Sequence, residues 1–175
     1  ENFSSKEINK IFLLAMKFKK NEKKYITILQ NKSLALLFEK ESTRTRTSFN
    51  IGMQKLGGKV IELDYKAIGF GKRESEEDIL KTLSQYIDCI VIRNHNHKKI
   101  KKYASLNVLP IINGLSDYSH PCQILSDIFT LKEQIGNLEH KKICWIGDYN
   151  NVLRSLLQVQ KLYMFKLHIA LPKQI

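Results

Sequence analysis

Short apolar runs alternate with helix-like segments along most of this chain. The runs that we expect to form strands are 34–38, 60–63, 89–92 and 108–112. Segments with the 3.6-residue spacing of amphipathic helices precede or follow them at 5–20, 43–56, 76–87, 98–105 and 120–135. Apolar strands that alternate with helices are typical of parallel sheets covered on both faces. The pattern therefore predicts an α/β fold with a parallel four-stranded sheet flanked by helices.

A second unit begins after Gly136, the residue at which the last of these helices is expected to end. It consists of a strand at 142–146, a turn at 147–151, a helix at 152–164 and a strand at 167–171. One βαβ unit buries too little surface to be a domain, so we expect it to be the first unit of a second α/β domain. The predicted domains are 1–136 and an incomplete 137–175.

Composition excludes some classes of partner. The formal charge of +12 and the pI near 9.6 would suit a polyanion. However, the lysine runs at 17–24 and 98–102 carry no interleaved aromatic residues for base stacking, so we expect no nucleic-acid partner. No apolar run approaches the 18 or so residues of a membrane span, and no signal peptide precedes the first helix. The sequence favours a soluble protein without membrane contact.

The three cysteines are far apart in the sequence and form no C-x-x-C pair. This pattern indicates reduced thiols in a cytoplasmic protein. Cys89 and Cys144 lie within apolar strand-like runs, and we expect both to be small core residues. Cys122 lies in a different setting, next to His120 and Pro121.

A Ser-Thr-Arg-Thr-Arg segment at 42–46 separates the first strand from the following helix. A helix start has unpaired backbone N–H groups and partial positive charge, so hydroxyls and guanidinium groups placed there can bind an oxyanion. The segment is not a Walker loop, because no Gly-x-x-x-x-Gly-Lys precedes it. A simpler alternative is that Ser42 or Thr43 only caps the helix while Arg44 and Arg46 are solvated.

Polar side chains also follow the third and fourth strands: Arg93 after the third, and the segment from Asn113 to His120 after the fourth, with Gln123 one turn further on. Ligands of open parallel sheets bind at the carboxyl ends of the strands, so these residues are expected to converge with Arg44 and Arg46. Arginines bind phosphate bidentately, and an imidazole with an arginine stabilises charge on a carbonyl oxygen. The alternatives are a salt bridge for Arg93 and an ordinary turn for His120.

No metal or cofactor is expected. His95 and His97 flank an asparagine in a polar loop, and no acidic or cysteine partner lies near them in the sequence.

Several segments strongly resemble the carbamoyltransferases: 38–49, Leu56-Gly57-Gly58, Arg93 and His120-Pro121-Cys122-Gln123. Phe-Glu-Lys before the Ser-Thr-Arg-Thr-Arg motif, and Asn-Gly-Leu-Ser-Asp at 113–117, place the chain nearer the ornithine than the aspartate branch. The resemblance runs from about residue 2 to the last residue. It implies carbamoyl transfer from carbamoyl phosphate to the δ-amine of ornithine, giving citrulline and phosphate in arginine metabolism. It also implies a homotrimer and no cofactor.

The resemblance assigns roles residue by residue. Ser42, Thr43, Arg44 and Thr45 would bind the phosphate, with Thr45 also near the carbamoyl oxygen. Arg93 and His120 would polarise that oxygen, and Gln123 would bind the carbamoyl amide. Asn151 would contact ornithine. No covalent intermediate is implied, so Cys122 is not a nucleophile.

Three departures from the family pattern stand out. Gly69 occupies the position where the family supplies a glutamine or lysine to a neighbouring subunit, although Lys72 and Arg73 are close. Arg154 occupies a helix position where an asparagine, histidine or small residue is expected. The family pattern continues beyond Ile175 with further ornithine-binding residues, so we expect these 175 residues alone to be inactive.

Two alternatives stay open on the sequence. One is a carbamoyltransferase for another amine, such as putrescine. The other is a non-catalytic, anion-binding remnant of the family.

Overall fold

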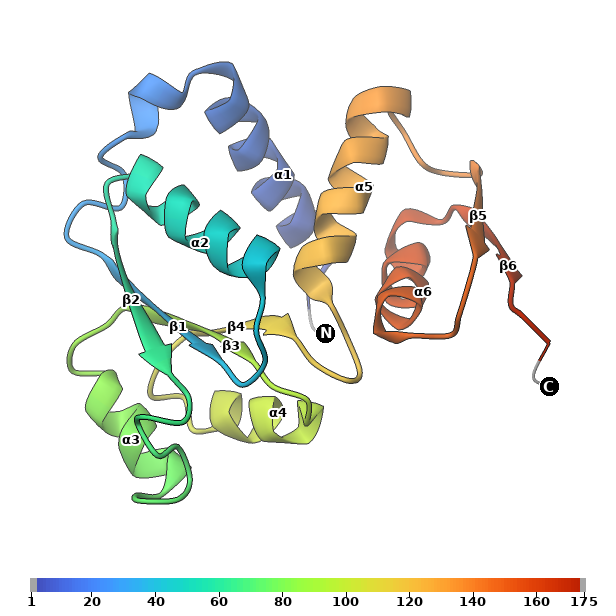
Figure 1. Cartoon of the computed structure of the whole chain (residues 1–175). Coiled ribbons are helices and arrows are strands. Elements are labelled where there is room, and N and C mark those ends of the chain that lie inside the picture. The colour runs from blue at the N-terminus through green and yellow to red at the C-terminus, as the bar shows by residue number, and fades with distance from the viewer. Residues whose placement is uncertain (1–2, 174–175) are drawn as a thin grey trace. The chain divides into compact units, whose positions relative to one another are not determined.

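The computed structural model of the chain describes residues 3–173, which group into two compact units. We call 17–117 the four-stranded unit, and 1–16 together with 118–175 the two-stranded unit. Each unit is described by itself. Figure 1 labels the elements of both.

The four-stranded unit is built on a parallel sheet. Its strands are β1 (Ser33–Phe38), β2 (Lys59–Asp64), β3 (Cys89–Arg93) and β4 (Ile111–Leu115), in the order β2-β1-β3-β4. Its helices are η1 (Glu22–Tyr25), α2 (Thr43–Lys55), α3 (Glu76–Leu83) and α4 (His97–Ser105). The α/β class and the parallel four-stranded sheet predicted from the sequence are confirmed.

Helices cover both faces of this sheet (Figure 1). On one face, α3 and α4 contribute Leu80, Ile100 and Tyr103 to a core formed with Ala35, Leu37, Ile90 and Ile92. On the other face, Phe49 and Met53 of α2 pack on Leu34, Leu36, Phe38 and Val91. Residues 34–38 are all buried, which explains why β1 is a continuous apolar run.

The two-stranded unit contains residues 5–16 of α1 (Ser5–Lys20), α5 (Pro121–Ile135), α6 (Asn151–Tyr163) and the parallel strands β5 (Lys142–Ile146) and β6 (Lys166–Ala170). The predicted βαβ unit is therefore present. Its core is formed mainly by residues of α1, α5 and α6, namely Ile8, Phe12, Ile124, Ile128, Leu138, Leu153, Leu156, Val159, Tyr163 and Phe165. The predicted division into domains at residue 136 stays a prediction.

Local structure explains two helix ends, and the predicted helix end at Gly136 is confirmed. Ser4 and Glu7 form a capping box at the start of α1: Ser4 Oγ accepts from Glu7 N at 3.3 Å, and the Glu7 carboxylate accepts from Ser4 N at 2.8 Å. Gly136 ends α5 with a φ of 74°. Between residues 3 and 173, no helix has the length and apolar character needed to cross a bilayer.

The fourth strand lies three residues later than predicted, at Ile111–Leu115 instead of 108–112. Pro110 has no N–H, and its carbonyl accepts from Ile90 N, so regular pairing starts only at Ile111. A bulge then shifts the register between Ile92 and Arg93. At Gly114, a Cβ would lie 2.9 Å from Val91 Cγ1, so glycine permits this close approach. Asn113 is consequently inside the strand and not after it.

Two further expectations were wrong. The third helix ends at Leu83 instead of 87, because the next turn is tighter: Gln85 N and Tyr86 N bond to carbonyls three residues back, those of Thr82 and Leu83. Cys144 is exposed and is not a core residue, since only alternate residues of β5, Ile143 and Trp145, pack against the core.

Candidate functional site

The start of α2 is the first part of the candidate site. Ser42 is its N-cap residue, with extended backbone at φ −155° and ψ 107°. Within the described part of the chain, the Ser42 side chain makes no capping hydrogen bond. The first N–H groups of α2 are therefore left for another acceptor, as at an oxyanion site. The alternative that Ser42 serves only as a cap is therefore wrong.

A hollow of about 640 Å³ lies beside this helix start, over the ends of β1 and β2. Its lining includes Ser42, Thr43 and Arg46 of the predicted segment, whereas Arg44 and Thr45 are outside the lining. Arg46 Nε lies 3.6 Å from Glu62 Oε2, and Arg46 Cζ lies 5.8 Å from the Phe38 ring centroid. Arg44 is exposed and forms no ion pair within residues 3–173. Arg44 is thus the arginine of the segment whose charge is not offset by a carboxylate.

Four acidic residues also line the hollow, namely Glu39, Glu41, Glu62 and Asp64. The backbone N–H groups of Ala67 and Lys66 donate to Asp64 Oδ1 at 3.0 and 2.7 Å, and these bonds hold the pKa of Asp64 below its ordinary 3.8. Asp64 is therefore charged at neutral pH. Burial, reinforced by the nearby Glu39 charge, raises the pKa of Tyr65, so its phenol stays protonated. The start of α2 is the part of this lining that offers uncapped backbone N–H groups to an anion.

Hydrogen bonds connect the residues that follow the carboxyl ends of β1, β3 and β4. Glu39 donates its N–H to the Arg93 carbonyl at 3.0 Å, and Glu39 Oε2 accepts from His95 N at 3.1 Å. Asp117, after β4, donates its N–H to the His95 carbonyl at 2.9 Å and accepts from His97 N at 2.9 Å. The loop that carries His95 and His97 therefore has a structural role. The same bonds fix the backbone position of Arg93.

Arg93 ends β3 directly opposite Phe38, the last residue of β1. Its Nε is buried and has no hydrogen-bond partner within residues 3–173, and no carboxylate there pairs with its side chain. A buried donor without an acceptor costs roughly 1–3 kcal/mol, which favours a bound acceptor at this position. The alternative of Arg93 as an internal salt-bridge partner is wrong.

His120 and Asn151 belong to the two-stranded unit, at the starts of α5 and α6. His120 is the N-cap residue before Pro121, and its backbone N–H donates to Ser155 Oγ at 2.9 Å. Ser155 Oγ in turn donates to the Asn151 carbonyl at 2.9 Å. Ser155 is only 2% exposed, so this one hydroxyl fixes the backbone at both predicted substrate-binding positions.

Gln123 is exposed on the first turn of α5, and its Nε2 donates to Asp127 Oδ1 at 2.9 Å. The predicted site residues therefore fall into two sets. Ser42, Thr43, Arg44, Thr45 and Arg93 are in the four-stranded unit, and His120, Gln123 and Asn151 are in the two-stranded unit. That the two sets converge on one crevice stays a prediction.

Comparison with known proteins decides the family. A family model described as the aspartate/ornithine carbamoyltransferase, carbamoyl-P binding domain, matches residues 1–133. The chain belongs to the aspartate/ornithine carbamoyltransferase family. It is 42% identical over 170 residues to the ornithine carbamoyltransferase of Methanocaldococcus jannaschii. The aligned region covers 97% of this chain and 56% of that relative. The chain is 40% identical over 173 residues to that of Aquifex aeolicus, covering 98% of this chain and 56% of the relative.

Solved structures of the carbamoyltransferase family share the fold. The ornithine carbamoyltransferase of Thermus thermophilus superposes with a TM-score of 0.90 at 40% identity, covering 98% of this chain and 60% of that one. The enzyme of Pyrococcus furiosus gives a TM-score of 0.91 at 36% identity, covering 98% and 55%. This chain therefore spans somewhat more than half the length of these carbamoyltransferases.

Some residues of this carbamoyltransferase-family site were missed by sequence reasoning. The side chain of Glu39 fastens the loop after β3, and Ser155 connects His120 to Asn151. Glu39 lies in the motif that carries the resemblance. However, a carboxylate that accepts from a distant backbone N–H produces no recognisable residue spacing in the sequence. Ser155 is a buried polar residue in an amphipathic helix, and that is the signal by which it could have been found.

Two other positions singled out in the sequence have local explanations. Burial raises the pKa of the Cys122 thiol, so it stays protonated at neutral pH. Gly69 has a φ of 63°, and its carbonyl accepts from Lys72 N and Arg73 N, which closes a tight turn. A turn with positive φ at this position explains a glycine there.

Proposed function

We propose that this chain binds carbamoyl phosphate at the start of α2, as part of an enzyme that transfers the carbamoyl group to the δ-amine of ornithine. The products are citrulline and phosphate. The observation that carries the proposal is the α2 N-terminus, whose own Ser42 does not cap it. The buried Nε of Arg93, one strand away, and the printed names of the relatives support the same donor.

The residues divide the chemistry between them in this proposal. Ser42, Thr43, Arg44 and Thr45 bind the phosphate through hydroxyls, amides and a guanidinium. Arg93 and His120 polarise the carbamoyl oxygen, and Gln123 binds the carbamoyl amide. Asn151 contacts ornithine.

The reaction needs no covalent enzyme intermediate. The lone pair of the ornithine δ-nitrogen attacks the carbonyl carbon, and the oxygen gains negative charge that Arg93 and His120 stabilise. The C–O bond to phosphate then breaks, phosphate leaves with the bonding electrons, and the nitrogen loses a proton. The raised pKa of Cys122 supports this route, because a protonated thiol is a poor nucleophile.

Binding of the donor is tested on the 175-residue chain. We expect its thermal midpoint to rise with carbamoyl phosphate concentration, as for any ligand that binds only the folded state. Arg44→Gln should weaken this response. The matched control is Lys55→Gln, at the exposed opposite end of α2, which should respond like wild type. An unchanged midpoint at millimolar ligand, or an unaffected Arg44→Gln variant, would count against the site.

Turnover is tested on the complete product of the gene, with ornithine and putrescine supplied separately. Citrulline formation supports the proposal, whereas a preference for putrescine would show that putrescine, and not ornithine, is the acceptor. Binding of carbamoyl phosphate without transfer to either amine would indicate a non-catalytic, anion-binding protein. On the 175 residues alone we expect no measurable citrulline, and robust turnover there would contradict that expectation.

The remaining family-derived expectations are proposals as well. We place the protein in the cytoplasm and in arginine biosynthesis, as a homotrimer. The three cysteines support the compartment, since none of Cys89, Cys122 and Cys144 is part of a disulfide within residues 3–173. The domain division at 1–136 and 137–175 belongs to the same proposal.

A further inference from the structure

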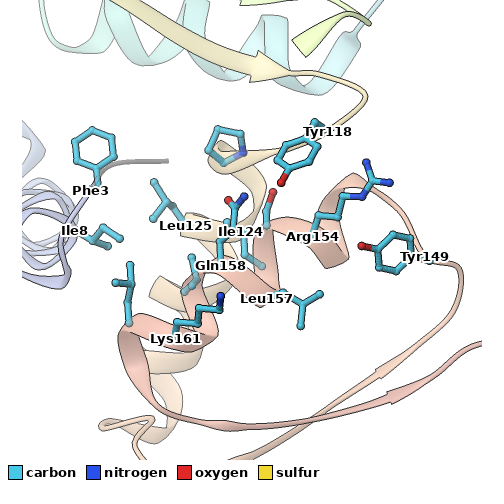
Figure 2. Close-up of a pocket in the computed structure, with 14 residues that line it drawn as sticks. Phe3, Ile8, Tyr118, Ile124, Leu125, Tyr149, Arg154, Leu157, Gln158 and Lys161 are labelled. Atoms are coloured by element: carbon cyan, nitrogen blue, oxygen red, sulfur yellow. The ribbon is translucent and has the colours of Figure 1, made fainter. Parts of the chain in front are cut away.

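Arg154 lies between two tyrosine rings. Its Cζ is 5.4 Å from the ring centroid of Tyr118 and 5.1 Å from that of Tyr149. Figure 2 shows the guanidinium between these rings at one end of a pocket of about 460 Å³. Tyr118 belongs to the segment that leads into α5, and Tyr149 to the loop that leads into α6. One side chain thus contacts two segments that are about 30 residues apart in the chain.

The attraction is electrostatic. The face of an aromatic ring carries negative potential, and a guanidinium within about 6 Å of the centroid is attracted to it. Arg154 forms no ion pair with a carboxylate anywhere between residues 3 and 173, so its charge is not engaged elsewhere there. The side chain is half-buried, which limits competition from water.

The next residue connects the same two segments by hydrogen bonds. Ser155 Oγ accepts from His120 N and donates to the Asn151 carbonyl, both at 2.9 Å. Arg154 and Ser155 therefore form a double connection from α6: aromatic contacts to Tyr118 and Tyr149, and hydrogen bonds two residues further on in each segment.

We propose that Arg154 is a positioning residue that holds the 118–120 segment and the 149–151 loop in one fixed arrangement. The roles of His120 and Asn151 in substrate binding rest on the proposed function, whereas the connection itself rests on geometry alone. With both segments fixed, the group that polarises the carbamoyl oxygen and the group that contacts the amino acid are ordered together before substrate binds. This lowers the entropy cost of assembling the reactants.

The first test measures the order of the two segments and does not depend on an activity assay. Trp145 is the single tryptophan of the chain, and its Nε1 donates to the Asp148 carbonyl at 3.2 Å, so its fluorescence reports on the 147–150 loop. Arg154→Met keeps the apolar stem and removes the charge. We expect it to change Trp145 emission and to speed hydrogen exchange in 118–120 and 149–151, with the thermal midpoint little changed.

Lys161→Met is the matched control. Lys161 is a cation on the same helix, two turns further on, with no aromatic ring or carboxylate partner in the described part of the chain. It should leave both loops unchanged, and Arg154→Lys should restore part of the protection. The proposal is overturned if Arg154→Met leaves exchange in both segments unchanged, or if Lys161→Met alters them equally.

The second test uses the complete gene product in a carbamoyl-transfer assay. We expect Arg154→Met to raise the KM for ornithine about three- to tenfold, the range of a cation–π contact, with Lys161→Met unchanged. An unchanged KM alongside faster loop exchange would overturn the role in substrate binding. If the wild type transfers carbamoyl to no amine, the proposed function fails, and the exchange result still decides the connection.

Discussion

Ser42 and Ser75 occupy the same N-cap position in two helices, but only one of them caps its helix. Ser75 Oγ accepts from Asp78 N at 3.1 Å, whereas Ser42 makes no such bond in the described part of the chain. Ser42→Ala should therefore weaken carbamoyl phosphate binding about tenfold, the usual effect of losing one hydrogen bond to a charged group, with little change in stability. Ligand titration and thermal denaturation measure the two effects.

The matched control for that substitution is Ser75→Ala. Losing a formed cap should lower the stability of this variant by about 1 kcal/mol. Its affinity for carbamoyl phosphate should not change, since Ser75 does not line the hollow. Equal losses of stability in the two variants would show that Ser42 does cap α2.

The three cysteines should differ in reactivity. Burial raises the pKa of Cys89 and of Cys122, which reduces the thiolate fraction that reacts, whereas Cys144 is exposed. We expect iodoacetamide at neutral pH to label Cys144 first, as measured by peptide mass spectrometry. Cys144→Ser should abolish the fast phase. Labelling of Cys122 at the rate of Cys144 would contradict the protonated, non-nucleophilic thiol on which the mechanism relies.

Among the elements, α2 presents the anion site and depends on a glycine just beyond its C-terminus. Gly57 has a φ of 84°, and a Cβ there would clash with the Ile26 carbonyl oxygen. Gly57→Ala should lower the free energy of unfolding by about 2 kcal/mol or more, because both strain and a backbone clash oppose it. The change in the urea midpoint measures the loss.

Gly52→Ala is the control within α2 itself. Apart from its chain neighbours and the backbone of α2 itself, no atom of residues 3–173 lies within 4 Å of the Cβ that it would add, and alanine is the better helix former. We expect a gain of about 0.5–1 kcal/mol. A loss in Gly52→Ala comparable to that in Gly57→Ala would mean that the Leu-Gly-Gly segment has no special backbone requirement.

The starts of β1 and β3 are joined by Asp88. It accepts from Lys32 Nζ at 2.7 Å and from Ser33 N at 2.8 Å, and these bonds, Lys32 first, hold its pKa below the ordinary 3.8. A lowered folded pKa gives stability that is present above about pH 4 and is lost as the pH falls through the folded value. Asp88→Asn should therefore lower the thermal midpoint by a few degrees at pH 7, and the difference should shrink progressively as the pH falls below 4.

Asp148→Asn is the control for this pH dependence. Its carboxylate is exposed and makes no hydrogen bond or ion pair within residues 3–173. The midpoint of this variant should follow wild type from pH 7 to pH 3. A gap between Asp88→Asn and wild type that is as large at pH 3 as at pH 7 would contradict an ionic origin.

The elements differ in how well the sequence predicts them. β1 and β3 were predictable because both are buried on two faces and read as unbroken apolar runs. β4 was misplaced because its limits depend on tertiary pairing: Pro110 delays the ladder and the bulge at Gly114 carries it through Asn113. The exposure of Cys144 was missed for a similar reason, since an apolar strand does not reveal which of its faces is covered.

The residues of the candidate site also differ in how well the sequence predicts them. The anion-binding segment was visible because its chemistry is local to one helix start. The roles of Glu39 and Ser155 could not be assigned from the sequence, because each acts through a hydrogen bond to backbone distant in sequence. Arg154 stood out in the sequence only as a departure, and its tyrosine partners could be recognised only after folding brought them together.

At the scale of the whole molecule, positive charges exceed negative ones by 12. Such an excess attracts small anions to the entire surface, with a strength that falls as salt screens it. The lining of the hollow combines both signs, so the proposed binding of an anion there depends on the geometry of the α2 start and not on net charge. Affinity for carbamoyl phosphate that survives 0.15 M salt therefore distinguishes the site from general attraction.

The two-stranded sheet should control association of the 175-residue chain. Within the described residues this sheet contains only β5 and β6, and Ile146 and Ile169 are 82% and 42% exposed. Uncovered strand edges with apolar side chains favour pairing between copies. We expect sedimentation velocity to show concentration-dependent association, and Ile146→Lys to shift the chain toward monomer. Ile26→Lys, at a turn residue that is 55% exposed, should not, and a wild-type chain that stays monomeric at every concentration would contradict this role of the sheet.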